Sequence, residues 1–270
     1  MSTFTTRVAW EWRSGIRQRF LLIYSVAAIL GFMLSFLFGG TNGSSDFRSL
    51  IAAVQVGVLL LPFLAIHLSA IDCNSTLRKD ELLLALPVSR SKLYLAKFLA
   101  QVLLFGAGLL VSLIALSPLL FRLRGAAILD VLALFGLFWL LGSFFIGAGN
   151  LIGILARGRI GALIAASAVW LSFSILGDTI AILLSNWLSG ISYRIALFTH
   201  LAINPVALIR TTGMLLLGGT ESYGAAGLLW LRVFSTLPGA VLFAVITTLL
   251  GIAVVVGIGV WRFQRTEVGS

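Results

Sequence analysis

Residues Asp72 to Lys92, DCNSTLRKDELLLALPVSRSK, form a polar break between two long apolar runs. The runs, Leu50 to Ala70 and Leu93 to Leu120, are each long enough to cross a bilayer. We therefore expect the break to be a loop between two membrane spans. Within it, charged residues lead into a leucine-rich turn that ends at Pro87, a pattern that predicts a short amphipathic helix followed by a basic turn.

This loop suits a docking surface that faces water, although an ordinary loop that obeys the positive-inside rule would also be basic. Both interpretations place it on the cytosolic side. The residues of the candidate docking surface are Arg78, Lys79, Asp80, Glu81, Pro87, Arg90 and Lys92.

The composition excludes a soluble globular domain. Of the 270 residues, 60% are hydrophobic and 10% are charged, and the mean hydropathy is +1.10. We expect an all-α integral membrane protein. The net charge of +10 comes from residues that flank apolar segments, which favours contact with anionic lipid headgroups and no nucleic-acid partner. The single cysteine, Cys73, excludes an internal disulfide bond.

The apolar runs predict six transmembrane helices in a single domain, 1–270. Residues 1–19, with Val8, Trp12 and Ile16 at helical spacing, predict an interfacial amphipathic helix at the cytosolic surface. Residues 186–235 contain only half-length apolar pieces, which predicts an extracytoplasmic or re-entrant segment with a half-helix from Ile203 to Leu217. The six spans are predicted at about 20–38, 50–70, 93–120, 128–156, 160–184 and 238–261.

The distribution of basic residues predicts the orientation. With both termini in the cytosol, thirteen of the 19 lysines and arginines lie on the inside. This arrangement puts the loop 72–92 in the cytosol. For a bacterial protein, the membrane is the inner one.

The sequence lacks the motifs of a self-sufficient enzyme or pump. There is no GxxxxGK[ST] phosphate-binding loop, so ATP with its Mg²⁺ is expected to bind a partner subunit. His67 and His200 lie far apart in the sequence and do not form a recognisable metal motif. We expect no catalytic residue, no metal and no cofactor in this chain.

Asp178 lies about two-thirds of the way along the fifth predicted span, where an ionised carboxylate is costly. It is a candidate lining residue of a translocation path, or a structural residue that is hydrogen-bonded or protonated. Asn150 and His67 are weaker candidates. A series of small residues in the fourth span allows close packing of helices, and its members are Ser143, Gly147, Gly149 and Gly153.

Three segments together resemble the membrane subunits of ABC transporters of the ABC-2 exporter family. They are AWEWRSGIRQRF (9–20), TLRKDELLLALPVSRSKLYLAKF (76–98) and NPVALIR (204–210). The resemblance implies that the loop 72–92 holds a coupling helix that binds a cytosolic ATPase. It also implies two ATPase copies, a homodimer of the permease and re-entrant segments between spans five and six.

Within that family the chain resembles the NosY-like subgroup, which serves the maturation of nitrous oxide reductase. The matching positions are Val169, Trp170, Asp178, Asn204, Pro205 and Arg210, with Glu11, Arg17, Arg19, Pro87, Arg90 and Lys97. The resemblance adds Asn204 and Arg210 to the candidates for the translocation path. Two features depart from the subgroup: an acidic run is replaced by Asn74, Ser75 and Thr76, and a Gly-Thr pair by Arg78 and Lys79.

The resemblance thus implies a permease that supports copper-site assembly, either by moving a sulfur species or by acting mechanically on a periplasmic partner. Two alternatives remain at this point: an ABC-2 exporter of a drug, lipid or glycan, and a membrane scaffold that transports nothing. A secondary transporter would need functional charges inside several spans, and only Asp178 clearly qualifies.

Overall fold

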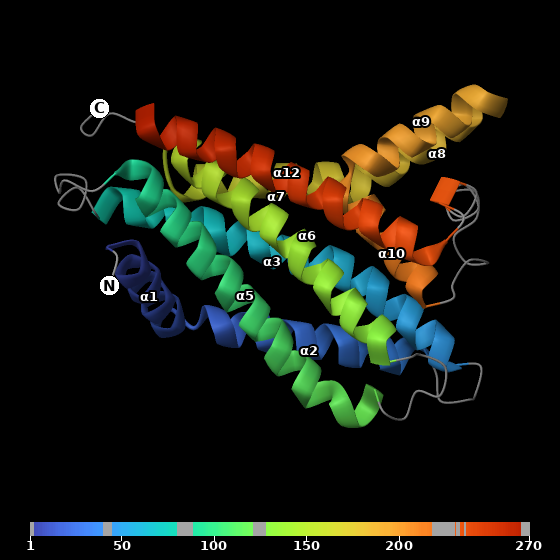
Figure 1. The fold of residues 1–270 in the computed structure, drawn as a ribbon, viewed down its shortest axis with the longest axis horizontal. Helices are drawn as coiled ribbons and strands as arrows, with labels where there is room; N and C mark the ends of the chain where they lie inside the picture. Colours follow the sequence, from blue (N-terminus) through green and yellow to red (C-terminus); the bar gives the residue numbers. More distant parts are fainter. Residues whose placement is uncertain are drawn as a thin grey trace.

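The computed structural model describes residues 3–39, 45–79, 89–120, 128–217, 230, 233–234 and 236–265, and every regular element in them is a helix (Figure 1). This confirms the all-α fold. The helices are α1 (Thr3–Arg17), α2 (Phe20–Gly39), α3 (Ser45–Lys79), α5 (Arg90–Leu120), α6 (Ile128–Leu155), α7 (Arg159–Leu171), the π-helix η1 (Ser172–Leu176), α8 (Gly177–Trp187), α9 (Gly190–Ile203), α10 (Pro205–Leu216) and α12 (Leu237–Arg265).

Five helical stretches in the described residues are long and apolar enough to cross a membrane. They begin at Ser49, Arg90, Ile128, Arg159 and Leu237. Two bent pairs, α1 with α2 and α9 with α10, raise the number of candidate spans to as many as seven if each pair forms one span. The chain is therefore a membrane protein, and the six predicted spans fall within this range.

Helix α6 is the centre of the bundle, and 67% of its span is buried. The long helix α3 packs along α6 and α2, while α12 packs on α6 and α1 on α5. The spans Arg159–Leu183 and Leu237–Arg265 are only 22% and 17% buried, so their outer faces are left for lipid or another chain. Both chain ends, the end of α3 and the start of α5 lie at one end of the molecule, which we call the terminal end (Figure 1).

The prediction of a loop over 72–92 is wrong at both of its edges. Helix α3 continues to Lys79, and α5 already begins at Arg90. Asp72, Cys73 and Asn74 are buried in the bundle instead of exposed in a loop. Their polar groups indicated a loop in the sequence, but a helix tolerates them where neighbouring helices supply partners.

The fifth span is interrupted by the π-helix η1, a form that is rare and is often found at functional sites. After α8, the chain turns back at Gly190, which has a positive φ of 61° that glycine adopts without strain. Helices α9 and α10 then meet at a bend of 100°. Helix α10 is buried along its length and contacts α3, α6 and α12, so the predicted half-helix near Ile203 to Leu217 is present.

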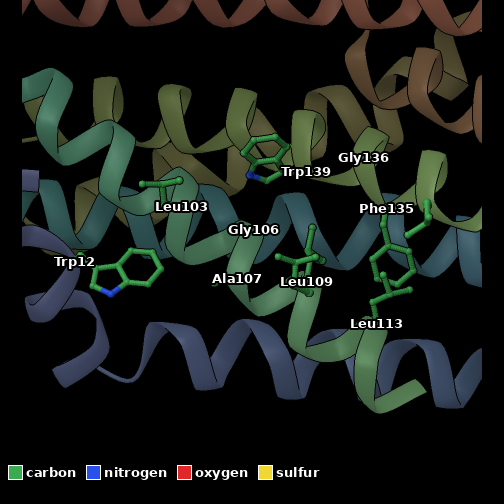
Figure 2. Close-up of a pocket in the computed structure, with 11 residues that line it drawn as sticks. Trp12, Leu103, Gly106, Ala107, Leu109, Leu113, Phe135, Gly136 and Trp139 are labelled. Carbon is green, nitrogen blue, oxygen red and sulfur yellow. The ribbon is translucent and has the colours of Figure 1, made fainter. Parts of the chain in front are cut away.

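The junction between α1 and α2 is also bent, by 59°. Arg19 has a positive φ of 62° there, which is uncommon for a residue with a side chain. The turn brings α1 across α5 at the terminal end. An apolar groove opens between α1, α5 and α6, with Trp12 at one end and Phe135 near the other (Figure 2).

Candidate functional site

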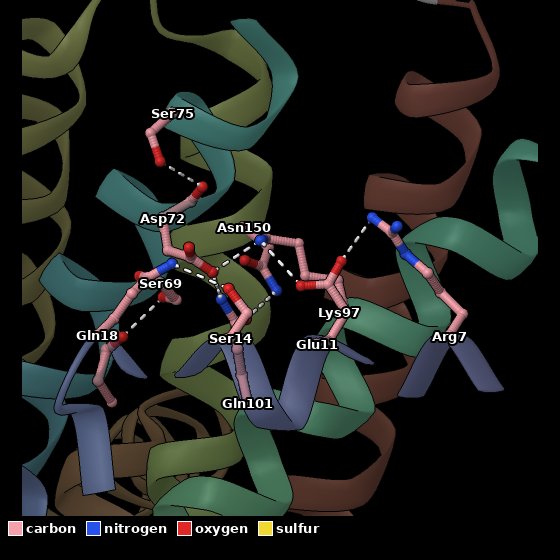
Figure 3. Close-up of polar contacts among 11 residues, drawn as sticks. Arg7, Glu11, Ser14, Gln18, Ser69, Asp72, Ser75, Lys97, Gln101 and Asn150 are labelled. Carbon is pink, nitrogen blue, oxygen red and sulfur yellow. Dashed lines mark hydrogen bonds and ion pairs between the residues drawn. The ribbon is translucent and has the colours of Figure 1, made fainter. Parts of the chain in front are cut away.

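Charged side chains from three helices and two amides meet near the terminal end in what we call the charge cluster: Arg7, Glu11, Asp72, Lys97, Gln101 and Asn150 (Figure 3). The Lys97 ammonium lies 2.7 Å from Asp72 Oδ2 and 3.7 Å from Glu11 Oε2. Arg7 Nη2 lies 2.7 Å from Glu11 Oε1. Two carboxylates are thus paired with two cations, so the buried charges compensate one another.

Two amides extend the charge cluster to the central helix. Gln101 Nε2 donates to Asp72 Oδ2 at 2.8 Å, and Asn150 Nδ2 donates to Gln101 Oε1 at 2.8 Å. Helices α1, α3, α5 and α6 each contribute at least one of these side chains. Because a buried charge is costly to separate from its partner, the charge cluster ties these helices together near the end of α3 and the start of α5.

The sequence signalled this cluster only in part. Asn150 was a weak candidate, and Glu11 and Lys97 appeared only among matching positions of the resemblance. Asp72 was assigned to the loop. The available signal was the presence of ionisable residues inside helical, apolar segments, which are rare and costly in membranes. Which of them pair depends on how α1 crosses α5, and no sequence pattern specifies that crossing.

Asn74 explains one departure from the NosY-like pattern. Its side-chain amide donates to Gly153 O at 3.1 Å and to Ala156 O at 2.9 Å, so it caps the last carbonyls of α6. An ionised carboxylate at this position accepts hydrogen bonds and cannot donate them. The asparagine therefore joins the end of α6 to α3 in a way that an acidic residue would not.

The predicted docking residues are divided between two helix ends. Arg78 and Lys79 form the end of α3, whereas Asp80, Glu81 and Pro87 lie outside the described residues. Arg90 begins α5, and its Nη1 donates to Gln264 O at 3.3 Å, near the end of α12. Lys92 is exposed. The two helix ends lie together at the terminal end of the molecule (Figure 1).

A second group, the Asp178 pair, joins α8 to α10. Arg210 on α10 donates from Nη1 to Asp178 Oδ2 at 2.6 Å and from Nη2 to Asp178 Oδ1, in a bidentate ion pair. The Asp178 side chain is 36% exposed and that of Arg210 is 12% exposed. The carboxylate thus reaches the molecular surface, while the guanidinium lies further inside.

Asn204 fixes the corner from which Arg210 extends. Its side-chain oxygen accepts from the backbone N–H groups of Val206 and Ala207, and its amide donates to Phe173 O in η1 at 2.9 Å. It is therefore the N-cap of α10 and a link to the π-helix. A Cβ at Gly177 would collide with the Asn204 amide, so the glycine permits this approach. The three residues predicted for a translocation path are thus brought together.

His67 and Trp170 join α3 to α7. The Trp170 indole donates to Leu59 O at 3.0 Å, next to the carbonyl that Pro62 leaves without a helical donor. The Phe63 carbonyl can only accept, so His67 Nδ1 donates to Phe63 O at 2.7 Å. The other ring nitrogen, Nε2, then accepts from the Ser167 hydroxyl at 2.9 Å. His67 therefore has a structural role between α3 and α7.

Comparison with known proteins agrees with this architecture. A family model described as "ABC-2 family transporter protein" matches residues 7–268. The "Probable ABC transporter permease protein NosY" of Stutzerimonas stutzeri is 25% identical to the chain over 278 aligned residues, which cover 95% of this chain and 96% of that protein. Permeases of this family are membrane-spanning subunits that work with an ATPase subunit, usually as dimers. The chain belongs to the ABC-2 family of transporter proteins and is the permease of an ABC transporter.

Proposed function

We propose that this permease has a NosY-like role, in which it supports copper-site assembly on an exported nitrous oxide reductase. The Asp178 pair carries the proposal. Asp178, Asn204 and Arg210, which matched the NosY-like pattern from two distant segments, lie within one group of contacts at the junction of η1, α8 and α10. The similarity to NosY along nearly the whole chain supports the same role.

In the proposed mechanism, the permease works as a homodimer with two cytosolic ATPase subunits. ATP-driven closure of those subunits pushes on the segment between the end of α3 and the start of α5. The charge cluster joins these two helices to α1 and α6, so the four move together. The movement reaches the re-entrant helix through α3 and α6, against which α10 packs.

At the far part of the bundle, this movement acts on the Asp178 pair. The pair joins the fifth span, weakened by the π-helix, to α10, so a shift of either element changes the path beside it. The result is either the passage of a sulfur species or a mechanical action on a periplasmic partner. Both outcomes use the same residues of this chain: Asp178, Asn204 and Arg210.

The maturation role is tested by deleting the gene in its own host and isolating the exported reductase. We expect a reductase of normal amount that lacks its full copper content, and recovery when the wild-type chain is supplied. A reductase with normal copper content in the deletion strain would refute the NosY-like role. That result would favour an ABC-2 exporter of a drug, lipid or glycan.

The docking assignment has a separate test. The triple variant Asp80→Asn, Glu81→Gln and Arg90→Gln should lose co-purification with the ATPase subunit, because it removes the charges expected at that contact. The control variant Arg122→Gln with Arg124→Gln, in the loop predicted on the opposite side, should retain it. Equal recovery of the ATPase with both variants would refute docking through 72–92.

A further inference from the structure

The groove between α1, α5 and α6 has the size of a ligand site. Its volume is about 710 Å³, within the roughly 300–1,000 Å³ typical of pockets that enclose small molecules. Gly106 and Ala107 on α5 and Gly136 on α6 hollow it out, and Trp12 and Trp139 line it (Figure 2). This groove has no part in the proposed function of the Asp178 pair.

The walls of the groove suit hydrocarbon. The lining side chains are leucine, alanine, phenylalanine and tryptophan, with no charged residue among them. The indole N–H of Trp139 already donates to Val102 O at 3.0 Å, so it is not available to a ligand. A polar cargo would lose its hydration here and would find almost no hydrogen-bond partner along these walls, which is unfavourable.

The groove has the length of one lipid leaflet. Along α5 its lining runs from Leu103 to Leu113, a rise of roughly 15 Å at the helical spacing. This is about half of the ~30 Å hydrocarbon core of a bilayer. At its near end lies Trp12, on the helix whose amphipathic pattern places it at the membrane interface. The groove therefore starts at the headgroup level and ends near the middle of the membrane.

Positive charges lie on the helix that supplies Trp12 to the groove. Arg13 and Arg17 are exposed on α1, one and five residues after Trp12, and Arg19 is exposed at the bend that follows. The chain as a whole has a net charge of +10. A phosphate headgroup at the membrane surface would thus meet several guanidinium groups, which attract anionic lipids and bind phosphate well.

We propose that the groove is a binding site for an anionic phospholipid of the leaflet that contains α1. One acyl chain fills the groove between α5 and α6, and the phosphate headgroup lies against the arginines of α1. The lipid then bridges α1 to the bundle, beside the charge cluster that makes the same connection with protein side chains. A zwitterionic lipid carries the same phosphate next to a compensating cation, so the arginines attract it less and it binds more weakly.

Gly136 offers a way to fill the groove without disturbing the protein. It lines the groove, and a Cβ built on it meets no atom within 4 Å. Gly257 in α12 has equally open space and lies away from the groove. Gly136→Leu therefore blocks the site, and Gly257→Leu is a matched control in another exposed helix. Gly136→Ala adds a single methyl group and serves where the leucine variant does not fold.

The experiment titrates purified protein with phosphatidylglycerol that carries brominated acyl chains, which quench nearby tryptophan fluorescence. For the wild type we expect saturable quenching of Trp12 and Trp139, with weaker binding of brominated phosphatidylcholine. Gly257→Leu should behave like the wild type. Gly136→Leu should lose most of the saturable component, and Gly136→Ala part of it. Arg13→Gln should lower the preference for phosphatidylglycerol about fivefold.

Several results would overturn the proposal. Equal quenching in Gly136→Leu and Gly257→Leu would mean that the groove is not the site. Quenching that never saturates would mean that the lipid only surrounds the protein and occupies no specific site. Equal affinity for phosphatidylglycerol and phosphatidylcholine would show that the site does not select anionic lipids. A change from dimer to monomer in Gly136→Leu alone would mean that a second copy of the chain fills the groove.

Discussion

At the residue scale, the charge cluster depends on Lys97, because this ammonium lies between two carboxylates. Its side chain is only 9% exposed, and those of Glu11 and Asp72 are 6% and 7% exposed. Burial makes each charge dependent on its neighbours, since water cannot replace a lost partner. Each charged side chain therefore adds little net stability, but removing one alone is costly because its partner is left buried and unpaired.

Replacing Lys97 with methionine should lower the free energy of unfolding by about 3–5 kcal/mol, because it leaves Asp72 without its closest cation. The double variant Lys97→Met with Asp72→Asn should recover part of this loss, since the amide is neutral and can still accept from Gln101. Denaturation in detergent, followed by circular dichroism, measures both. A double variant no more stable than Lys97→Met would show that Asp72 is not the essential counter-charge.

The Asp178 pair should respond asymmetrically to substitution. Without Arg210, the Asp178 carboxylate still reaches the molecular surface, whereas Arg210 without Asp178 remains charged and is more buried. Asp178→Asn should therefore destabilise the protein more than Arg210→Met, by about 1 kcal/mol or more. Melting temperatures of the two purified variants test the order. The reverse order would mean that the pair does not hold Arg210 in place.

At the element scale, α3 and α6 approach closely where the small residues of α6 face α3. Cβ atoms at Gly149 and Gly153 would overlap the backbone of α3 near Ala70. The close packing predicted from the series of small residues is therefore present at these two positions, whereas a Cβ at Gly147 would make only ordinary contacts with α12. Dispersion between the two backbones and the Asn74 cap join the helices there.

Gly153→Ala should lower the free energy of unfolding by about 1–3 kcal/mol, because its Cβ would lie 2.7 Å from both Ala70 O and the Cys73 Cβ, so α3 must shift. Gly161→Ala is the control. That position in α7 has open space, so the alanine should be neutral or slightly stabilising through its higher helix propensity. Thermal unfolding of both variants gives the comparison. Equal stability of the two would argue against a close contact between α3 and α6.

At the scale of the whole molecule, the two ends of the bundle differ in what they present. Both termini and the two helix ends that carry predicted docking residues lie at the terminal end, and the start of α12 lies at the other (Figure 1). The excess of lysine and arginine predicts that the terminal end lies in the cytosol. Cys73 is buried, so it is a poor reporter of this orientation.

Introduced cysteines in a Cys73→Ala background should report the orientation. Lys92 at the start of α5 and Thr236 before α12 are both exposed. We expect Thr236→Cys to react with a membrane-impermeant maleimide in intact cells, and Lys92→Cys to react only after the membrane is opened. Mass spectrometry of the purified protein quantifies the labelling. The opposite pattern would invert the topology and remove the cytosolic docking surface.

The sequence by itself determined the class of the protein and the approximate positions of its spans. Apolar runs of bilayer length leave the backbone no option but helix, so composition and spacing suffice. The half-helix near Asn204 could also be predicted, because an Asn-Pro pair is a strong start signal for a helix. Asp178 was visible as a costly charge inside a span.

Only the tertiary structure decided where the second span ends and which charges pair. Asp72, Cys73 and Asn74 have the residue types of a loop, yet they are helical because α5 and α6 supply the partners of Asp72 and Asn74. The pairing of Glu11 with Lys97, and of Asp178 with Arg210, depends on how separate helices cross. Local sequence sets the helical period, but contacts between segments far apart in the chain depend on the packing of the whole bundle.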